Sequence, residues 1–128
     1  MARLEGIAKA QFYPTPPSVV ERVAALVRHA PSSHRRVARL LDPCCGAGHA
    51  LRQFADTLGG GETYGIEIEQ HRAAKAREVL DHVIAGSAFA VRLGHEAFSC
   101  LWLNPPYDEG DGGKRLEHSF LTTLSRAL

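Results

Sequence analysis

The stretch VARLLDPCCGAG, residues 37–48, decides the fold. Its apolar run, Val37 to Leu41, predicts a buried strand, which ends at Asp42-Pro43 because proline cannot continue a strand ladder. Gly46 and Gly48 then let the backbone turn sharply before a predicted helix at about residues 49–58. The pattern therefore predicts a strand, a glycine loop and a helix in immediate succession.

Strands and helices alternate outward from this stretch. Val19, Val20, Val23, Leu26 and Val27 recur at helical spacing and predict a one-sided helix through about Arg28, preceded by an extended, proline-rich arm at residues 12–17. The remaining expected elements are strands at 63–68, 83–84 and 99–103, a helix at 70–80, and a last helix with Leu116, Phe120, Leu121 and Leu124 on one face. Alternating strands and helices predict a doubly wound α/β fold with a parallel sheet, incomplete at about four strands.

Composition is that of an ordinary globular domain. The 128 residues are 45% hydrophobic and 23% charged, with a net charge of +1, which argues against a largely disordered chain and against an overall field that recruits polyanions. Charge is nevertheless uneven, because residues 1–41 hold seven Lys and Arg residues against two acidic ones. Such a basic front is either a solvated helix face or a surface for a polyanion.

Membrane and secretory classes are not expected. No apolar run approaches the ~20 residues of a membrane helix, and the N-terminus lacks the apolar segment of a signal peptide. Cys44, Cys45 and Cys100 form neither a disulfide framework nor a zinc-type spacing, and the seven histidines are scattered singly. We therefore expect no metal and a reducing, cytoplasmic location.

The glycine loop lies where a doubly wound sheet binds ligands, beyond the carboxyl ends of its strands. A lone Gly-x-Gly is also compatible with a plain tight turn. Glu67, however, ends the second strand about 20 residues after the loop, where an acidic side chain can accept hydrogen bonds from both ribose hydroxyls. No Lys follows the glycines as in a phosphate loop, and Leu51 stands where a dinucleotide fingerprint has Gly or Ala. The loop therefore favours a nucleoside that lacks a pyrophosphate.

Asn104-Pro105-Pro106-Tyr107 directly follows the fourth predicted strand. Together with the Asp42-Pro43-x-x-Gly46-x-Gly48 loop and the Phe12-Tyr13-Pro14-Thr15-Pro16 arm, this motif resembles the class I S-adenosylmethionine-dependent methyltransferases. Within that family the chain is similar to the amino-methylating branch, which includes the DNA N6-adenine enzymes. The resemblance covers roughly residues 11–108, in the motif order of the subgroup whose DNA-reading domain comes last.

The chemistry of methyl transfer to an exocyclic amine explains the motif. The Asn104 side-chain oxygen and the Pro105 carbonyl would accept the amine hydrogens, and Pro106 would help to fix the turn without a competing N–H. Tyr107 would stack on a flipped base, which contributes about 1–3 kcal/mol. Because the cofactor methyl is already activated, positioning can supply most of the catalysis. Cys44 and Cys45 are expected to pack or to contribute backbone, and not to act as nucleophiles.

The resemblance also implies the remaining cofactor contacts. Phe12, Tyr13 and Thr15 would touch the methionine end of S-adenosylmethionine or cover it, and Asp42 would lie beside its amino group. Further expected cofactor-binding residues are Pro43, Cys44, Gly46 and Gly48 in the loop, Glu67 on the ribose, and Ile68, Ser87 and Ala88 around the adenine. The family's usual Asp after the third strand is replaced here by Gly86-Ser87-Ala88-Phe89. Ser87 accepts a hydrogen bond more weakly than a carboxylate, which lowers the affinity expected for the cofactor.

The length limits how much of the family's fold is present. The resemblance implies a sheet ordered 3-2-1-4-5-7-6, of which about four strands, 3-2-1-4, are expected in a single partial domain spanning residues 1–128. Residues 1–35 would form the arm and helix, and 36–128 the cofactor-binding core. Strand four, with Leu101, Trp102 and Leu103, would be an exposed apolar edge. We expect it to be covered by a second copy of the chain, another subunit or a missing C-terminal half.

The leading functional prediction is methyl transfer to adenine N6 in nucleic acid, most directly DNA. Arg3, Lys9, Arg35, Arg36 and Arg39 are then candidates for phosphate contacts. Protein glutamine and ribosomal RNA bases are alternative acceptors, since the same motif suits both. A truncated domain that binds S-adenosylmethionine without turnover is a different class of hypothesis. An NAD-dependent oxidoreductase is disfavoured by Leu51 and by the Asn-Pro-Pro-Tyr motif.

Overall fold

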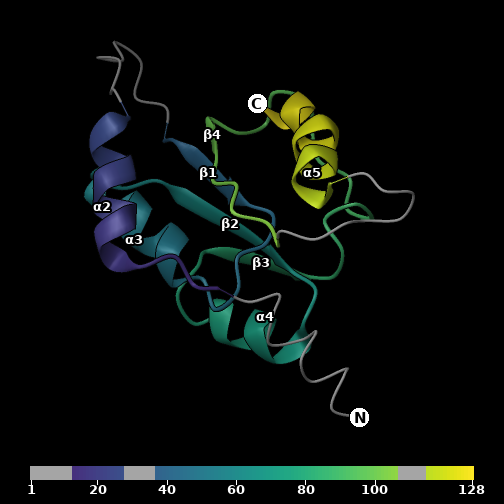
Figure 1. Ribbon diagram of the computed structural model, residues 1–128, viewed down its shortest axis with the longest axis horizontal. Coiled ribbons are helices and arrows are strands. Elements are labelled where there is room, and N and C mark those ends of the chain that lie inside the picture. Colours follow the sequence, from purple (N-terminus) through teal and green to yellow (C-terminus); the bar gives the residue numbers. More distant parts are fainter. Residues whose placement is uncertain (1–12, 28–36, 107–114) are drawn as a thin grey trace.

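The computed structural model describes residues 13–27, 37–106 and 115–128, and its centre is one parallel sheet (Figure 1). Four strands lie in the order β3-β2-β1-β4, all parallel. The doubly wound α/β class and the strand order 3-2-1-4 are therefore confirmed.

The elements follow the predicted alternation along the chain. In chain order they are α2 (Pro17–Leu26), β1 (Arg39–Asp42), α3 (His49–Thr57), β2 (Glu62–Glu67), α4 (Gln70–Ala76), β3 (His82–Ala85), β4 (Cys100–Leu101), α5 (Leu116–Leu124) and the short 3-10 helix η1 (Ser125–Ala127).

Side chains of β1 alternate between two cores, one on each face of the sheet. Leu40 joins a cluster formed with α2, α3 and the α4 segment, whereas Leu41 joins a cluster formed with α5. In Figure 1, α2 and α3 accordingly lie on one side of the sheet and α5 on the other. Because a strand exposes successive residues to opposite faces, two adjacent leucines are enough to anchor helices on both sides.

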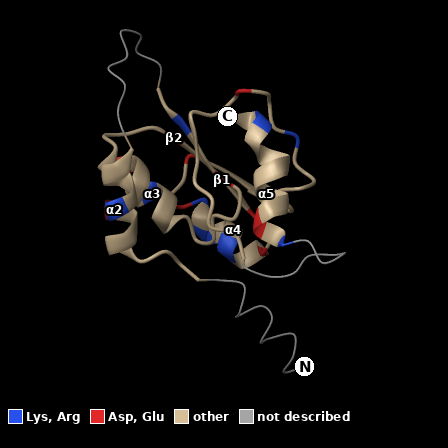
Figure 2. Ribbon diagram, turned by 45° about the horizontal axis from the view of Figure 1, so that its top comes forward, with Lys and Arg blue, Asp and Glu red and all other residues tan. Residues whose placement is uncertain are grey.

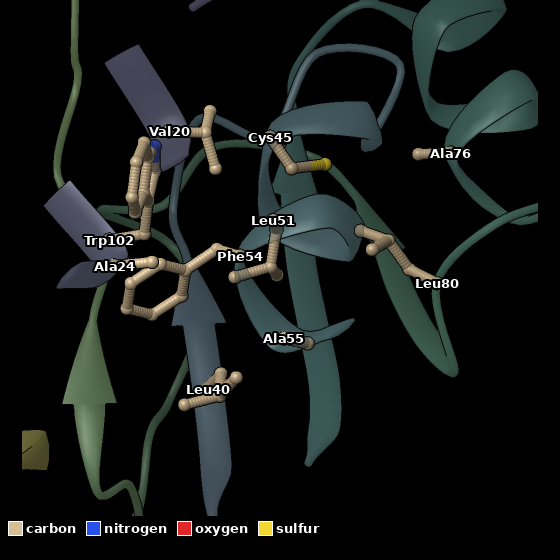
Figure 3. Close-up of a cluster of buried hydrophobic side chains, with 10 residues drawn as sticks. All are labelled: Val20, Ala24, Leu40, Cys45, Leu51, Phe54, Ala55, Ala76, Leu80 and Trp102. Atoms are coloured by element: carbon tan, nitrogen blue, oxygen red, sulfur yellow. The ribbon is translucent and has the colours of Figure 1, made fainter. Parts of the chain in front are cut away.

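The first core is centred on an aromatic pair. Phe54 of α3 and Trp102, just after β4, have ring centroids 4.9 Å apart and are tilted by 52°. Figure 3 shows Val20 and Ala24 of α2 and Leu51 of α3 beside this pair. This contact joins the N-terminal helix to the end of the fourth strand, and it therefore positions everything that follows Trp102.

Some predicted elements differ in extent. Helix α4 ends at Ala76, short of the expected residue 80, and the chain continues in turns that bury Leu80 against the first core. Strand β4 is restricted to Cys100–Leu101, although the Ser99 and Trp102 N–H groups also donate to β1. Both elements are shorter because the chain must turn to fill the core or to form the loop beyond it.

The prediction that one apolar face of the first helix is buried is wrong in part. Of its predicted apolar residues only Val20 is buried, while Val19, Val23 and Val27 are partly exposed and Leu26 is 80% exposed. Leu121 of α5 is likewise 52% exposed, so that helix buries Phe120 and Leu124 but not its whole predicted face. The spacing identified the helices correctly, but it could not tell which apolar residues have a partner.

The partly exposed valines border a groove along the outer edge of β4. This groove, of about 460 Å³, runs between Val19, Val23 and Val27 on one side and residues 100–104 on the other. Among the described residues, β4 pairs only with β1, so its outer backbone edge has no strand beside it. Trp102 is nevertheless buried, because α2 covers it, and the predicted apolar edge is only partly exposed.

Within the described ranges, no helix combines the length and the apolar character needed to cross a membrane.

We expect Gly65→Ala to destabilise the fold. A Cβ at Gly65, in the middle of β2, would lie 2.6 Å from Cys45 Sγ and 2.7 Å from Leu80 Cδ1, so that the glycine loop and the turn after α4 would have to shift. Overpacking of this kind costs about 1–3 kcal/mol. Chemical denaturation measures the loss. Gly86→Ala is the control, because a Cβ there meets nothing within 4 Å; equal stability of the two variants would contradict the prediction.

Candidate functional site

A cavity of about 360 Å³ opens at the carboxyl ends of the strands. Most of the predicted site residues line it, although they come from the arm, the glycine loop, the ends of β2 and β3, and the segment after β4. The predicted residues in its wall are Tyr13, Thr15, Asp42, Pro43, Cys44, Gly48, Glu67, Ile68, Ser87, Ala88, Asn104, Pro105 and Pro106. Phe12 and Tyr107 lie outside the described residues.

The glycine loop needs both of its glycines for conformation. Gly46 and Gly48 have φ values of 56° and 87°, in the left-handed region that side chains with a Cβ adopt at a cost. Gly48 is also the N-cap of α3, and a Cβ there would lie 2.9 Å from both Val79 and Leu80. The loop can therefore pass close to the α4 segment and direct α3 away from the cavity.

Glu67 is the most heavily hydrogen-bonded side chain of the site. Its Oε2 accepts from the Gly46 N–H at 2.9 Å, and its Oε1 accepts from the Glu69 N–H at 2.9 Å and from Arg72 Nη2 at 2.8 Å. The carboxylate is only 5% exposed, and the ion pair with Arg72 compensates for its burial. Gly46 itself does not line the cavity; it holds Glu67, which does.

Asp42 lies at the end of β1, in the same wall, and is 4% exposed. Burial, together with the nearby charge of Glu67, raises the pKa of Asp42 to about 7, despite a hydrogen bond from the Cys44 N–H at 2.9 Å. The cavity wall thus holds two carboxyl groups, and Arg72 pairs with Glu67. The second carboxyl group, that of Asp42, favours a ligand that carries positive charge.

The two loop cysteines are structural in character. Cys45 is 7% exposed and packs in the first core, while the Cys44 backbone N–H holds Asp42. Burial, with the charges of Asp42 and Glu67, raises the pKa of both thiols far above the ordinary range. Both therefore stay protonated, which agrees with the prediction that neither is a nucleophile.

The Asn-Pro-Pro motif meets the N-terminal arm at one end of the cavity. Asn104 Nδ2 donates to Thr15 Oγ1 at 3.0 Å, across 89 positions of sequence. Pro105 is buried and Asn104 is half-buried, so the motif is held at the end of β4 with its side chain in the cavity wall.

The opposite wall is apolar. Ile68 is 68% exposed, and Phe89 packs on Phe120 of α5 with ring centroids 4.6 Å apart. Ser87 Oγ accepts the Phe89 N–H at 3.2 Å, so its hydroxyl oxygen already has one partner. This wall offers flat, apolar surface suited to an aromatic ring.

Sequence reasoning missed several residues of the wall. Arg72 stands five residues after Glu67, a spacing that could have suggested an ion pair across the start of a helix. Leu116 and Phe120 carried only the signal of an apolar helix face, and Trp102 that of an apolar strand edge, and neither pattern shows that these residues reach this cavity.

Most cations of the basic front, the Lys and Arg residues of positions 1–41, lie outside the described residues. Of its cations, Arg22 and Arg39 are described, whereas Arg3, Lys9, Arg28, Arg35 and Arg36 lie outside the described residues. In the ribbon of Figure 2, the Lys and Arg positions of the described part are spread over several elements and do not gather in one place. Arg39 starts β1, at the opposite end of the strand from the cavity, and donates to Tyr64 Oη at 2.8 Å and to the Ala97 carbonyl. The structure therefore gives Arg39 local partners and does not place it beside the site.

In the parts of the chain that the structure describes, no three His, Cys, Asp or Glu residues are grouped to hold a metal ion.

Residues 1–125 match the Uncharacterised methyltransferase family (DUF6094). The chain belongs to this family. No curated protein sequence matches it.

Solved structures share the fold at low identity. A Haloferax volcanii complex of the Trm112 methyltransferase activator with a methyltransferase matches with a TM-score of 0.63 and 19% identity over 84% of this chain. M. jannaschii TYW2 in complex with AdoMet matches with a TM-score of 0.59 and 15% identity over 93% of this chain. The plantazolicin methyltransferase BpumL in complex with SAH matches with a TM-score of 0.58 and 13% identity over 84% of this chain. The chain spans 46%, 51% and 39% of these three structures, respectively. Family and fold together confirm the predicted methyltransferase class.

We expect Asp42→Asn to stabilise the protein increasingly as pH rises. Because the folded pKa of about 7 lies above the ordinary 3.8, the folded chain binds an extra proton between these values, and wild-type stability falls across that window. Asparagine cannot ionise, so the variant should gain about 2–4 kcal/mol over wild type between pH 4 and pH 8. Denaturation at several pH values measures this. Asp56→Asn, at an exposed acid on α3, is the control; parallel curves for wild type and Asp42→Asn would contradict the prediction.

Proposed function

We propose that this chain is the cofactor-binding and catalytic part of an S-adenosylmethionine-dependent methyltransferase that methylates an exocyclic amino group, with adenine N6 in DNA as the acceptor. One observation carries the proposal: a single cavity joins Asp42, Glu67 and the Asn104-Pro105 pair. In the proposed arrangement, residues 1–35 form the arm and helix of a partial domain and residues 36–128 its cofactor-binding core.

The donor set of the cavity fits this cofactor. S-adenosylmethionine carries an ammonium group, a sulfonium group, two ribose hydroxyls and an adenine ring. Asp42 would pair with the ammonium. No cation among the described residues pairs with this buried carboxyl group, so a cationic ligand is favourable there. Glu67 would accept from the ribose, sharing its oxygens with Gly46 and Arg72. Ile68, Ala88 and Ser87 would flank the adenine. The AdoMet and SAH complexes among structures of the same fold support the assignment.

When bound, S-adenosylmethionine supplies an electrophilic methyl group: the amine lone pair forms the N–C bond, the C–S bond breaks, sulfur keeps the electron pair as S-adenosylhomocysteine, and the nitrogen loses a proton to water. The chain itself would raise the reactivity of the amine. The lone pair of the amine nitrogen is delocalised into the base. Two acceptors for the amine hydrogens, Asn104 Oδ1 and the Pro105 carbonyl, would favour a pyramidal nitrogen whose lone pair can attack. Tyr107 is proposed to stack on the acceptor base.

Other methyl acceptors also fit the Asn104-Pro105 pair. A glutamine side-chain amide and a ribosomal RNA base need the same two acceptors as adenine. The excess of Lys and Arg in residues 1–41 favours a nucleic acid. A domain that binds S-adenosylmethionine without turnover is the alternative from another class, and the transfer assay below separates them.

The proposal also includes a partner at the outer edge of β4. The apolar groove beside Val19, Val23 and Val27 is the surface that a second copy of the chain, another subunit or further polypeptide would cover. The three cysteines are free thiols, which supports a reducing, cytoplasmic compartment.

We expect Asn104→Ala to abolish transfer without abolishing cofactor binding. Loss of the acceptor oxygen should lower the transfer rate by about 10²-fold, as when one preorganised group is removed from other active sites. The assay follows labelled methyl from S-adenosylmethionine to unmethylated DNA, ribosomal RNA and a glutamine peptide, and calorimetry measures the Kd for S-adenosylhomocysteine.

Gln70→Ala provides the control for Asn104→Ala, because it removes an exposed amide at the start of α4. Cofactor binding with no transfer to any acceptor would favour the binding domain. A wild-type chain that is not stabilised by millimolar S-adenosylhomocysteine would refute the cofactor site.

We expect Glu67→Gln to weaken S-adenosylhomocysteine binding by at least about tenfold, because the ribose hydroxyls lose a charged acceptor and Arg72 loses its ion pair with Glu67. Glu62→Gln is the matched control, at the opposite, exposed end of the same strand. Calorimetry on both variants measures the difference, and thermal melts check that both are folded. Equal affinities would show that Glu67 is structural only.

A further inference from the structure

One hydrogen bond joins the two distant motifs of the site. Thr15 belongs to the arm before α2, and Asn104 follows β4, yet Asn104 Nδ2 donates to Thr15 Oγ1 at 3.0 Å. Both residues line the 360 Å³ cavity, and both also line the groove along β4. The pair therefore lies where the two hollows meet.

In the structure the Thr15 hydroxyl is the acceptor of this bond, so the Nδ2 end of the Asn104 amide faces the arm. A carboxamide has one end that only accepts and one that only donates, and the two are nearly the same size. Because Nδ2 is directed to Thr15, the Oδ1 atom lies on the other branch of the amide. An acceptor amine needs that oxygen, whereas an amide turned the other way would present N–H groups to N–H groups.

We propose that Thr15 is a positioning residue: its hydroxyl holds the Asn104 amide in the orientation that presents Oδ1 to the methyl acceptor. This inference rests on the proposed function, and it goes beyond the contact with the methionine end that the resemblance implies for Thr15. Thr15 acts on the reaction through Asn104.

The backbone conformation of the arm is restricted on both sides of Thr15. Thr15 stands between Pro14 and Pro16, and a residue before proline is restricted to extended conformations. Pro16 has φ −58° and ψ 142° and caps α2, whose first residue is Pro17. Gln53 Nε2 of α3 donates to the Pro17 carbonyl at 3.0 Å. Little chain entropy therefore remains to be lost when Thr15 binds Asn104.

The Asn104 backbone is held independently of Thr15. Trp102 N–H donates to the Leu41 carbonyl at 2.8 Å, and its indole is buried against Phe54 and α2. Pro105, which is buried, follows directly. With the backbone held on both sides, removal of the Thr15 hydroxyl should affect the side-chain amide and leave the strand in place.

The test compares Thr15→Val, which removes the hydroxyl and keeps the shape, with Thr15→Ser, which keeps the hydroxyl. Thr57→Val is the matched control, at an exposed threonine on α3 whose hydroxyl donates to the Gln53 carbonyl. Thr15→Ala serves as a second hydroxyl-free variant should the valine disturb the arm, and thermal melts establish that each variant is folded.

The first readout observes Asn104 directly and needs no turnover. Asn104 is the only asparagine of the 128 residues, so amide-labelled asparagine produces a single side-chain NH₂ signal in an NMR spectrum of the full chain. We expect one of its protons to exchange slowly with water in wild type and in Thr15→Ser. In Thr15→Val that proton should exchange about three- to tenfold faster, which is what one neutral hydrogen bond is worth.

The second readout separates positioning from cofactor binding. At saturating S-adenosylmethionine, Thr15→Val should lower the single-turnover rate of methyl transfer about tenfold, beyond any change in the Kd for S-adenosylhomocysteine, and Thr15→Ser should restore the rate. An unchanged amide signal would overturn the proposal. So would a loss confined to the Kd, because Thr15 would then be a cofactor contact alone.

Failure of the proposed function would be recognised separately. If wild type transfers methyl to none of the acceptors, the catalytic claim fails, and the exchange rate of the Asn104 amide alone decides whether Thr15 orients it. If wild type is active and both Thr15→Val and Thr15→Ala retain its rate, the proposed function stands and the positioning role is refuted.

Discussion

The site depends on one buried carboxylate at the end of β2. Glu67 accepts hydrogen bonds from the glycine loop through Gly46, from the start of α4 through Glu69, and from the side chain of Arg72. Together with the bond from the Cys45 N–H to the Ile66 carbonyl, these bonds join the glycine loop, the end of β2 and the start of α4. Because an ionised group can be buried only when it is paired and hydrogen-bonded, the segments must keep this arrangement for the fold to be stable. The same requirement shapes the cavity.

Asp42 shows the cost of such an arrangement. It is buried near Glu67, no cation among the described residues pairs with it, and burial together with the charge of Glu67 raises its pKa to about 7. A buried carboxyl group without a paired cation favours the binding of a cationic ligand. Binding of such a ligand would restore part of the folding stability that burial of the carboxyl group costs. Arg72 thus compensates for the buried charge of Glu67, whereas Asp42 would favour a ligand that carries positive charge.

Much of the fold was predictable because its signals are local. Apolar runs ended by Asp42-Pro43 and by Asn104-Pro105 mark strands, Gly46 and Gly48 mark the loop, and Glu67 follows at the spacing expected of a ribose acceptor. Errors arose where a residue's environment depends on distant elements. Val19 and Val23 of α2 border a groove and do not enter the core, and Phe120 reaches the cavity from α5.

By itself, the sequence determined the alternation of strands and helices, the strand order through its resemblance, and the residue types of the site. Those depend on spacing, on proline and glycine, and on side-chain chemistry, all of which are readable along the chain. Only the tertiary structure decided that Arg72 pairs with Glu67, that Asp42 is buried with no cation paired to it in the described part of the chain, and that Thr15 meets Asn104 across 89 positions. The reason is physical: burial and pairing arise when parallel strands bring their ends together, and no local pattern specifies which ends will meet.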